Sequence, residues 1–137
     1  MYNKAHMSLQ LSHTTKSQPP KWPYEKIKDL ILGKKYDLSL AFVGVSRAQQ
    51  LNLAYRKKDY VPNVLSFPLD ASHGEIIICP VIAKTQAKDF DLSVDGYIAY
   101  LFIHGLVHLK GHVHGLQWRN WSKSISTNST SRNFYNV

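Results

Sequence analysis

Three histidines in the last third of the chain have a spacing that suits a metal ion. His104, His108 and His114 follow the pattern H-x3-H-x5-H. Residues four apart on a helix lie one turn apart on the same face, so the first two imidazoles would point the same way. Gly111 is expected to end the helix and let the chain turn, which would bring His114 back toward that face. The spacing therefore predicts an open site for one Zn²⁺ or another transition metal, with one position left for water.

Two alternatives to this site stay open. A single histidine on an apolar helix is more often a core residue with a hydrogen-bond partner, although two at helical spacing weaken that interpretation. His112 is a second possible ligand beyond Gly111. It is two residues from His114 and the two cannot easily share one direction, so we favour His114. If His112 supplied a fourth ligand, the site would be closed and structural.

The residue after the first histidine argues against a peptidase. Zinc peptidases carry H-E-x-x-H, in which the glutamate acts as general base. Here Gly105 follows His104 and has no side chain to accept a proton. A water on the metal would have to lose its proton through the ion itself, another residue or a substrate phosphate. The pattern therefore favours phosphodiester cleavage over amide cleavage.

The composition favours one small domain with a polyanionic partner. The chain has 137 residues, of which 44% are hydrophobic and 19% charged. This length is enough for one core. Lys and Arg total 17 against 9 acidic residues, for a net charge of +8. Such an excess favours binding to phosphate groups, because neutralising them releases counterions.

The same bulk features predict a cytoplasmic protein without a membrane partner. Cys79 is the single cysteine, so no internal disulfide can form. A reducing compartment is the simplest expectation for such a chain. The polar N-terminal segment lacks the apolar centre of a signal peptide, and the apolar run Tyr97–Ile103 is far shorter than a membrane span.

Local patterns predict an α+β fold for residues 1–137, a single small domain in which strands and helices are mixed. A buried central helix over Val94–Lys110, capped by Ser93 or Asp95, would carry the first two histidines. The segments 1–20 and 125–137 are expected to fray, apart from a weak edge strand over Met7–Thr14. The other expected elements are a helix from Pro23 through Leu32 ended by Gly33, a strand over Tyr36–Val43, a helix over Arg47–Lys57 capped by Ser46, strands Val64–Leu69 and Glu75–Cys79 joined by a hairpin or a short crossover, a helix over Val81–Phe90 and a short helix over Leu116–Ser124.

Four segments of the sequence resemble one known family. The segment His104–His114 resembles the H-G-x-L-H-L-x-G-Y-D-H signature of the YbeY endoribonucleases. Tyr55–Asp59 is similar to that family's Y-R-x-K-D, Asn63–Pro68 to its D-V-L-S-F-P, and Gly74–Pro80 to its G-D-I-V-I-C-P strand. These segments occur in the family's order, and the resemblance covers about residues 36–115.

The resemblance implies a fold, an activity and partners. It implies a single α+β domain with a small mixed, mostly four-stranded sheet packed with helices, and a zinc site of three histidines, here His104, His108 and His114. It implies a metal-dependent single-strand endoribonuclease that serves small-subunit rRNA maturation and ribosome quality control. The implied partners are single-stranded RNA, rRNA and the small ribosomal subunit, with no DNA expected.

The resemblance also assigns a catalytic role to Arg56, which matches the family's functional arginine. A guanidinium group stays charged and can hold phosphate oxygens with two hydrogen bonds. From composition alone, Arg56 would be interpreted as a surface residue in a basic cluster with Lys57 and Lys58. The resemblance favours the functional interpretation.

The sequence departs from the family pattern at several positions, and two other functions follow from this. His112 and Val113 stand where the family has Tyr and Asp, and Pro62 stands where Thr is usual. The lost carboxylate would have supported the third ligand. One alternative is therefore a ribosome-associated RNA-binding protein with a structural metal site. The other is a metallohydrolase of a different substrate such as a peptide, against which Gly105 argues.

Overall fold

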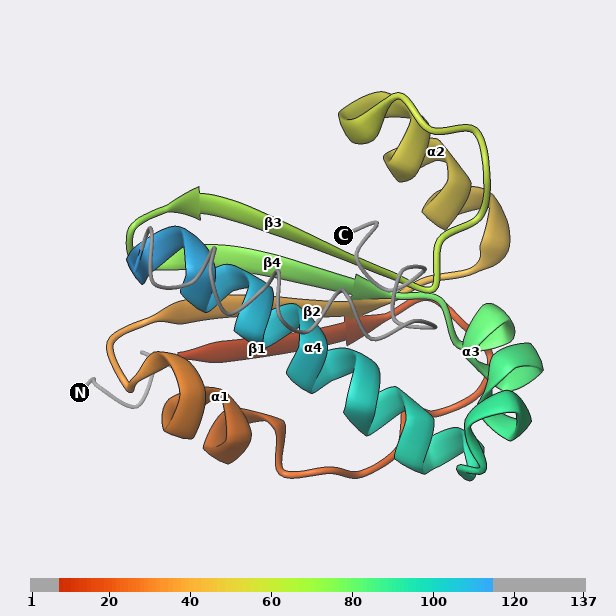
Figure 1. Cartoon of the computed structure of the whole chain (residues 1–137), viewed down its shortest axis with the longest axis horizontal. Coiled ribbons are helices and arrows are strands. Elements are labelled where there is room, and N and C mark those ends of the chain that lie inside the picture. The colour runs from red at the N-terminus through yellow and green to blue at the C-terminus, as the bar shows by residue number, and fades with distance from the viewer. Residues whose placement is uncertain (1–7, 115–137) are drawn as a thin grey trace.

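The computed structural model describes residues 8–114, and their side chains as far as residue 111. Figure 1 shows the course of the chain. The elements are β1 (Leu9–His13), α1 (Tyr24–Leu32), β2 (Asp37–Phe42), α2 (Val45–Arg56), β3 (Val64–Asp70), β4 (His73–Ile78), α3 (Pro80–Gln86), the 3-10 helix η2 (Ala87–Phe90) and α4 (Val94–His114). The expected short helix over Leu116–Ser124 and the expected fraying of 125–137 lie outside the described residues.

The four strands form one mixed sheet in the order β1-β2-β4-β3. β1 pairs with β2 and β2 with β4 in parallel, whereas β3 and β4 pair antiparallel. The prediction of a mixed four-stranded sheet in an α+β fold is therefore confirmed, and β3 and β4 are joined as a hairpin. β3 is an edge strand, and its register shifts between Pro68 and Asp70.

Helices cover both faces of the sheet (Figure 1). α1 and α4 lie on one face, where the sheet contributes alternate residues such as Leu40, Ile76 and Ile78 to the main core. α2 lies on the other face, where Ala48 and Leu51 pack against Leu65 and Ile77 in a smaller core. The alternation of side chains along each strand separates these two cores.

The central helix α4 begins as the sequence predicts. The hydroxyl of Ser93 accepts a hydrogen bond from the backbone N–H of Gly96 at 3.0 Å, so Ser93 is the cap. The helix then buries Ile98, Phe102 and Leu109 against the sheet. Among residues 8–114 no single helix is long and apolar enough to cross a membrane. Only the consecutive segments Pro80–Phe90 and Val94–Gly111, taken together, reach that length and apolar composition, and the chain bends by 103° between them.

Two predicted helix boundaries are wrong. α4 does not end at Gly111 but continues to His114. A glycine inside a helix costs only about 1 kcal/mol relative to alanine, so packing of the rest of the helix outweighs it. α2 starts at Val45 with Gly44 as its cap, and Ser46 makes no capping bond. The reason is that Val43 still donates to the carbonyl of Ile78, so the chain can turn only at Gly44.

Two glycines let α4 approach the sheet closely. A Cβ atom on Gly105 of α4 would lie 3.0 Å from Cδ1 of Ile76 on β4. A Cβ atom on Gly74 of β4 would lie 3.0 Å from Cδ1 of Leu109 on α4 and would overlap the hydroxyl of Tyr36. The hydroxyl of Ser66 on β3 donates to the carbonyl oxygen of Gly105 at 3.1 Å. The missing side chains and this hydrogen bond fix the height and rotation of α4 on the sheet.

The first test concerns this close approach. Gly74→Ala should lower the free energy of unfolding by about 1–3 kcal/mol, because the added methyl group overpacks the contact between α4 and β4. Urea unfolding measures this change. Gly44→Ser is the control: open space surrounds Gly44, and serine is also a good cap, so the change should stay within about 0.5 kcal/mol. Tyr36→Phe should recover part of the loss in the Gly74→Ala protein. A Gly74→Ala protein as stable as the wild type would contradict the packing.

Candidate functional site

His104 and His108 lie on one flank of α4. Both are half-buried, and Nε2 of His104 and Nδ1 of His108 are shielded from solvent. The residues that face the sheet, such as Phe102 and Leu109, lie to one side of them on the helix. The predicted pair, four residues apart on a helix packed against the sheet, is therefore present. It is half-buried and not at the centre of the core.

This flank faces the β3 edge of the sheet. Tyr97 shares the flank, and its hydroxyl donates to Oε1 of Gln86 at 3.0 Å. The side-chain amide of Asn63, which immediately precedes β3, donates to the same oxygen at 3.0 Å. These two bonds connect α4, the end of α3 and the start of β3. The histidines thus lie between the body of the sheet and its edge.

The third predicted ligand lies at the C-terminal end of α4. His114 is the last residue of α4, and its side chain lies outside the described residues. The turn after Gly111, which was expected to bring it back, is replaced by helix. Among the described side chains, residues 8–111, no group of three or more His, Cys, Asp or Glu could hold a metal ion. The described part supplies two imidazoles with suitable spacing, and a metal site needs at least one further ligand.

Arg56 lies at the C-terminal end of α2, on the opposite face of the sheet from α4. Its Nη1 donates to Oδ1 of Asn52 at 3.3 Å and to the hydroxyl of Tyr60 at 3.4 Å. Both partners are neutral, so the guanidinium keeps its positive charge for another ligand. The adjacent Tyr55 ring contacts Phe67 of β3, with ring centroids 5.3 Å apart. The structure therefore places Arg56 near the β3 edge, on a helix that packs on the other face of the sheet from the helix with the histidines.

The network of Asn63, Gln86 and Tyr97 is a feature that the sequence analysis missed. Tyr97 is fully buried and Asn63 nearly so. Burial raises the pKa of the Tyr97 phenol, which therefore stays neutral and can donate. The signal in the sequence was a polar residue directly before an apolar strand. Such a residue is costly to bury unless it finds a partner.

Cys79 and His73 do not belong to this site. Cys79 is buried in the smaller core beneath α2, and burial raises the pKa of its thiol. It is therefore a small core residue. The ring of His73 is exposed at the β3–β4 hairpin and contacts Asp70 at 2.7 Å and Asp37 at 3.2 Å.

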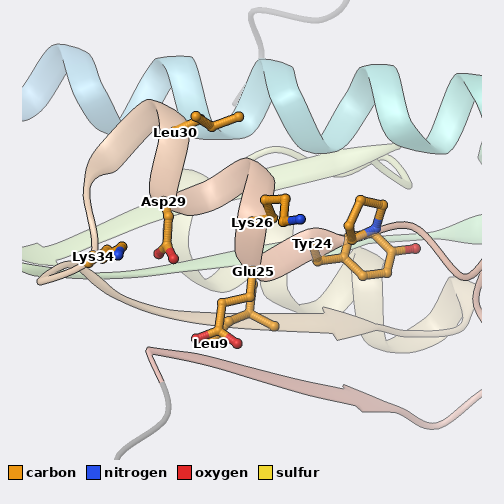
Figure 2. Close-up of a pocket in the computed structure, with 8 residues that line it drawn as sticks. Leu9, Tyr24, Glu25, Lys26, Asp29, Leu30 and Lys34 are labelled. Carbon is orange, nitrogen blue, oxygen red and sulfur yellow. The ribbon is translucent and has the colours of Figure 1, made fainter.

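A hollow of about 740 Å³ lies elsewhere, against α1 and β1 (Figure 2). Its acidic groups already have partners in the chain. Glu25 accepts a hydrogen bond from Ser8 at 2.8 Å, and Asp29 pairs with the buried Lys28 at 2.6 Å. The hollow therefore offers no convergent reactive groups, and the flank of α4 remains the candidate site.

The second test concerns the polar network beside the histidines. Gln86→Leu removes the oxygen that accepts bonds from Asn63 and Tyr97, so two buried donors lose their partner. We expect the free energy of unfolding to fall by about 1–3 kcal/mol. Thr85→Ala is the control, because its exposed hydroxyl bonds only locally, to the carbonyl of Ile82. Equal stability of the two variants in urea unfolding would count against the network.

Comparison with known proteins supports the resemblance seen in the sequence. The family model described as "Endoribonuclease YbeY" matches residues 6–128. A protein named Endoribonuclease YbeY from Finegoldia magna is 44% identical over 86 residues, which cover 58% of this chain and 56% of the relative. One from Methylobacillus flagellatus is 30% identical over 111 residues, covering 79% and 74%.

The likeness extends to a solved structure. The solution structure of TM1509 from Thermotoga maritima aligns with a TM-score of 0.54 at 22% identity, covering 89% of this chain and 97% of that one. This likeness concerns the fold alone. The chain spans little more than half the length of the relatives from Finegoldia magna and Bdellovibrio bacteriovorus, at 56% and 53%. Because the family model matches most of the chain, the protein belongs to the YbeY family.

Proposed function

We propose that this chain is a metal-dependent endoribonuclease that cleaves single-stranded RNA, and that it acts in small-subunit rRNA maturation and ribosome quality control in the cytoplasm. Membership of a family whose relatives are named endoribonucleases supports the activity. The structural observation that carries the proposal is the pair His104 and His108, one helical turn apart on a flank fixed by close packing. The net charge of +8 suits an RNA partner.

The ion, zinc in our proposal, would be held by His104, His108 and His114. Imidazole is a common ligand for zinc and for other transition metals. When bound, such an ion polarises a phosphate oxygen or lowers the pKa of a water molecule. The contribution of this chain is to fix two of the ligands on one helix, so that little side-chain freedom remains to be lost on binding. Gly105 faces Ile76 of the sheet, so this position has no part in proton transfer.

Arg56 would hold the RNA backbone and not the reacting centre. It lies on the α2 side of the sheet, whereas the histidines lie on the α4 side. The two sides meet at the β3 edge. An RNA strand that crosses this edge reaches both, with one phosphate near the histidines and another against the guanidinium. Lys57 and Lys58 follow directly and add to the positive charge there.

A second candidate is an RNA-binding protein of the ribosome in which the metal is structural. Two observations favour it: α4 continues through Gly111, and Arg56 lies across the sheet from the histidines. In that case RNA would bind along the same edge without being cut. The metal content alone does not separate the two candidates, and cleavage must be measured as well.

The third test measures zinc content and cleavage of a single-stranded RNA for purified variants. His104→Ala and His108→Ala should each lower metal content and cleavage at least about tenfold, the smallest loss expected when a ligand's support is removed. Arg56→Ala should keep the metal and cleave about 10- to 100-fold more slowly, as expected for one lost hydrogen bond to a charged group. His73→Ala is the control, because its ring is exposed and contacts carboxylates at the hairpin. It should change neither quantity.

The outcomes separate the candidates. Cleavage that persists in a strong chelator would overturn the metal-dependent enzyme. A wild-type protein that holds zinc and binds RNA but cuts no RNA would favour the structural metal site. A wild-type protein that neither binds nor cuts RNA would overturn both.

A further inference from the structure

A row of aromatic rings runs along the flank of α4 and ends at His104. Phe90 of η2 and Tyr97 are stacked, with centroids 5.3 Å apart and an angle of 17° between the rings. Tyr97 and Tyr100 follow at 6.1 Å and 18°. Tyr100 and His104 are 6.2 Å apart at 30°. Neighbouring rings in this row are thus inclined to each other by 30° or less, and Tyr100 lies between Tyr97 and the proposed metal ligand His104.

Burial changes along this row. Tyr97 is fully buried, and its hydroxyl is bonded to Gln86, so its ring is fixed. Tyr100, the next ring, is 40% exposed. A large flat side chain thus reaches solvent while lying beside an immobile ring. Little conformational freedom is lost when a ligand packs against a side chain held in this way.

We infer that Tyr100 is a substrate-binding residue that stacks against a base of the RNA strand next to the histidines. The inference rests on the proposed function and adds a contact for the base. Aromatic side chains bind single-stranded nucleic acids by stacking, and this contact is tolerant of sequence because every base has a flat face. Tyr and His rings serve this role in RNA-binding proteins.

The distance from Tyr100 to His104 along α4 indicates which nucleotide Tyr100 contacts. Tyr100 and His104 are four residues apart on one helix, which is about 6 Å along the helix axis. The base on Tyr100 therefore belongs to a nucleotide at or beside the phosphate held at the histidines. Stacking there would orient this part of the strand, whereas Lys and Arg side chains elsewhere bind phosphates along its length.

The test uses a residue of equal exposure on the same helix as control. Ile103 is also 40% exposed, and as an aliphatic residue three positions from Tyr100 it tests the loss of neighbouring apolar surface without the loss of a ring. The variants are Tyr100→Ala, Tyr100→Phe and Ile103→Ala. Each is measured for KM and kcat of single-stranded RNA cleavage at constant salt. Fluorescence anisotropy of the metal-loaded protein then gives the Kd for the same RNA and for a matched strand with abasic sites, with gel electrophoresis confirming that the strand is intact during the measurement.

Tyr100→Ala should raise KM and Kd for the RNA by roughly five- to 150-fold, the range for one lost stacking contact. Tyr100→Phe keeps the ring and should stay within about twofold, as should Ile103→Ala. On the abasic strand, wild type and Tyr100→Ala should bind equally. Thermal unfolding of each variant identifies any loss of folded protein.

The possible outcomes separate a failure of the stacking contact from a failure of the proposed function. If the wild type cleaves RNA and Tyr100→Ala behaves as Ile103→Ala does, the stacking contact is wrong and the proposed function stands. The same conclusion follows if Tyr100→Ala weakens binding of the abasic strand as much as that of the RNA. If the wild type neither binds nor cleaves RNA, the proposed function and this inference fall together.

Discussion

The close contact between α4 and β4 is the constraint on which the candidate site depends. Gly105 and Gly74 leave out a side chain on each side of the contact, and Ile76 and Leu109 fill the space. The Ser66 hydroxyl adds a hydrogen bond from β3 to a carbonyl of the same helix. A helix held this closely can neither rotate nor shift without overlap of core atoms. Because the rotation of α4 about its own axis is fixed, His104 and His108 lie on the flank toward β3 and not in the centre of the core.

Much of the fold could be predicted from patterns of neighbouring residues in the sequence. The strand over Asp37–Phe42 alternates buried and more exposed residues, as its sequence does. The strands β3 and β4 and the helix that carries the histidines were also predicted, because residue periodicity and turn residues act locally, whereas the choice between a hairpin and a short crossover for β3 and β4 was left open. The boundary at Gly111 was missed because a local preference of about 1 kcal/mol yields to packing that the sequence does not display.

The relation of Arg56 to the histidines was beyond sequence reasoning for a different reason. Which face of the sheet a helix covers is a property of the whole topology. The pattern of α2, with Ala48 and Leu51 buried, shows only that it has one apolar side. The aromatic row was missed because α4 is apolar on most sides, so the sequence does not distinguish Tyr97 from Tyr100 by burial. Only the structure shows that one is buried and the other exposed.

The irregular end of β3 has a consequence for self-association. An edge strand presents unpaired backbone groups and is a natural template for another strand. In β3 this edge carries Pro68, which has no N–H to donate, and the register shifts directly after it. A second molecule therefore finds no regular ladder to extend at this end of the sheet. An irregular, proline-containing edge of this kind disfavours edge-to-edge pairing between strands of two molecules.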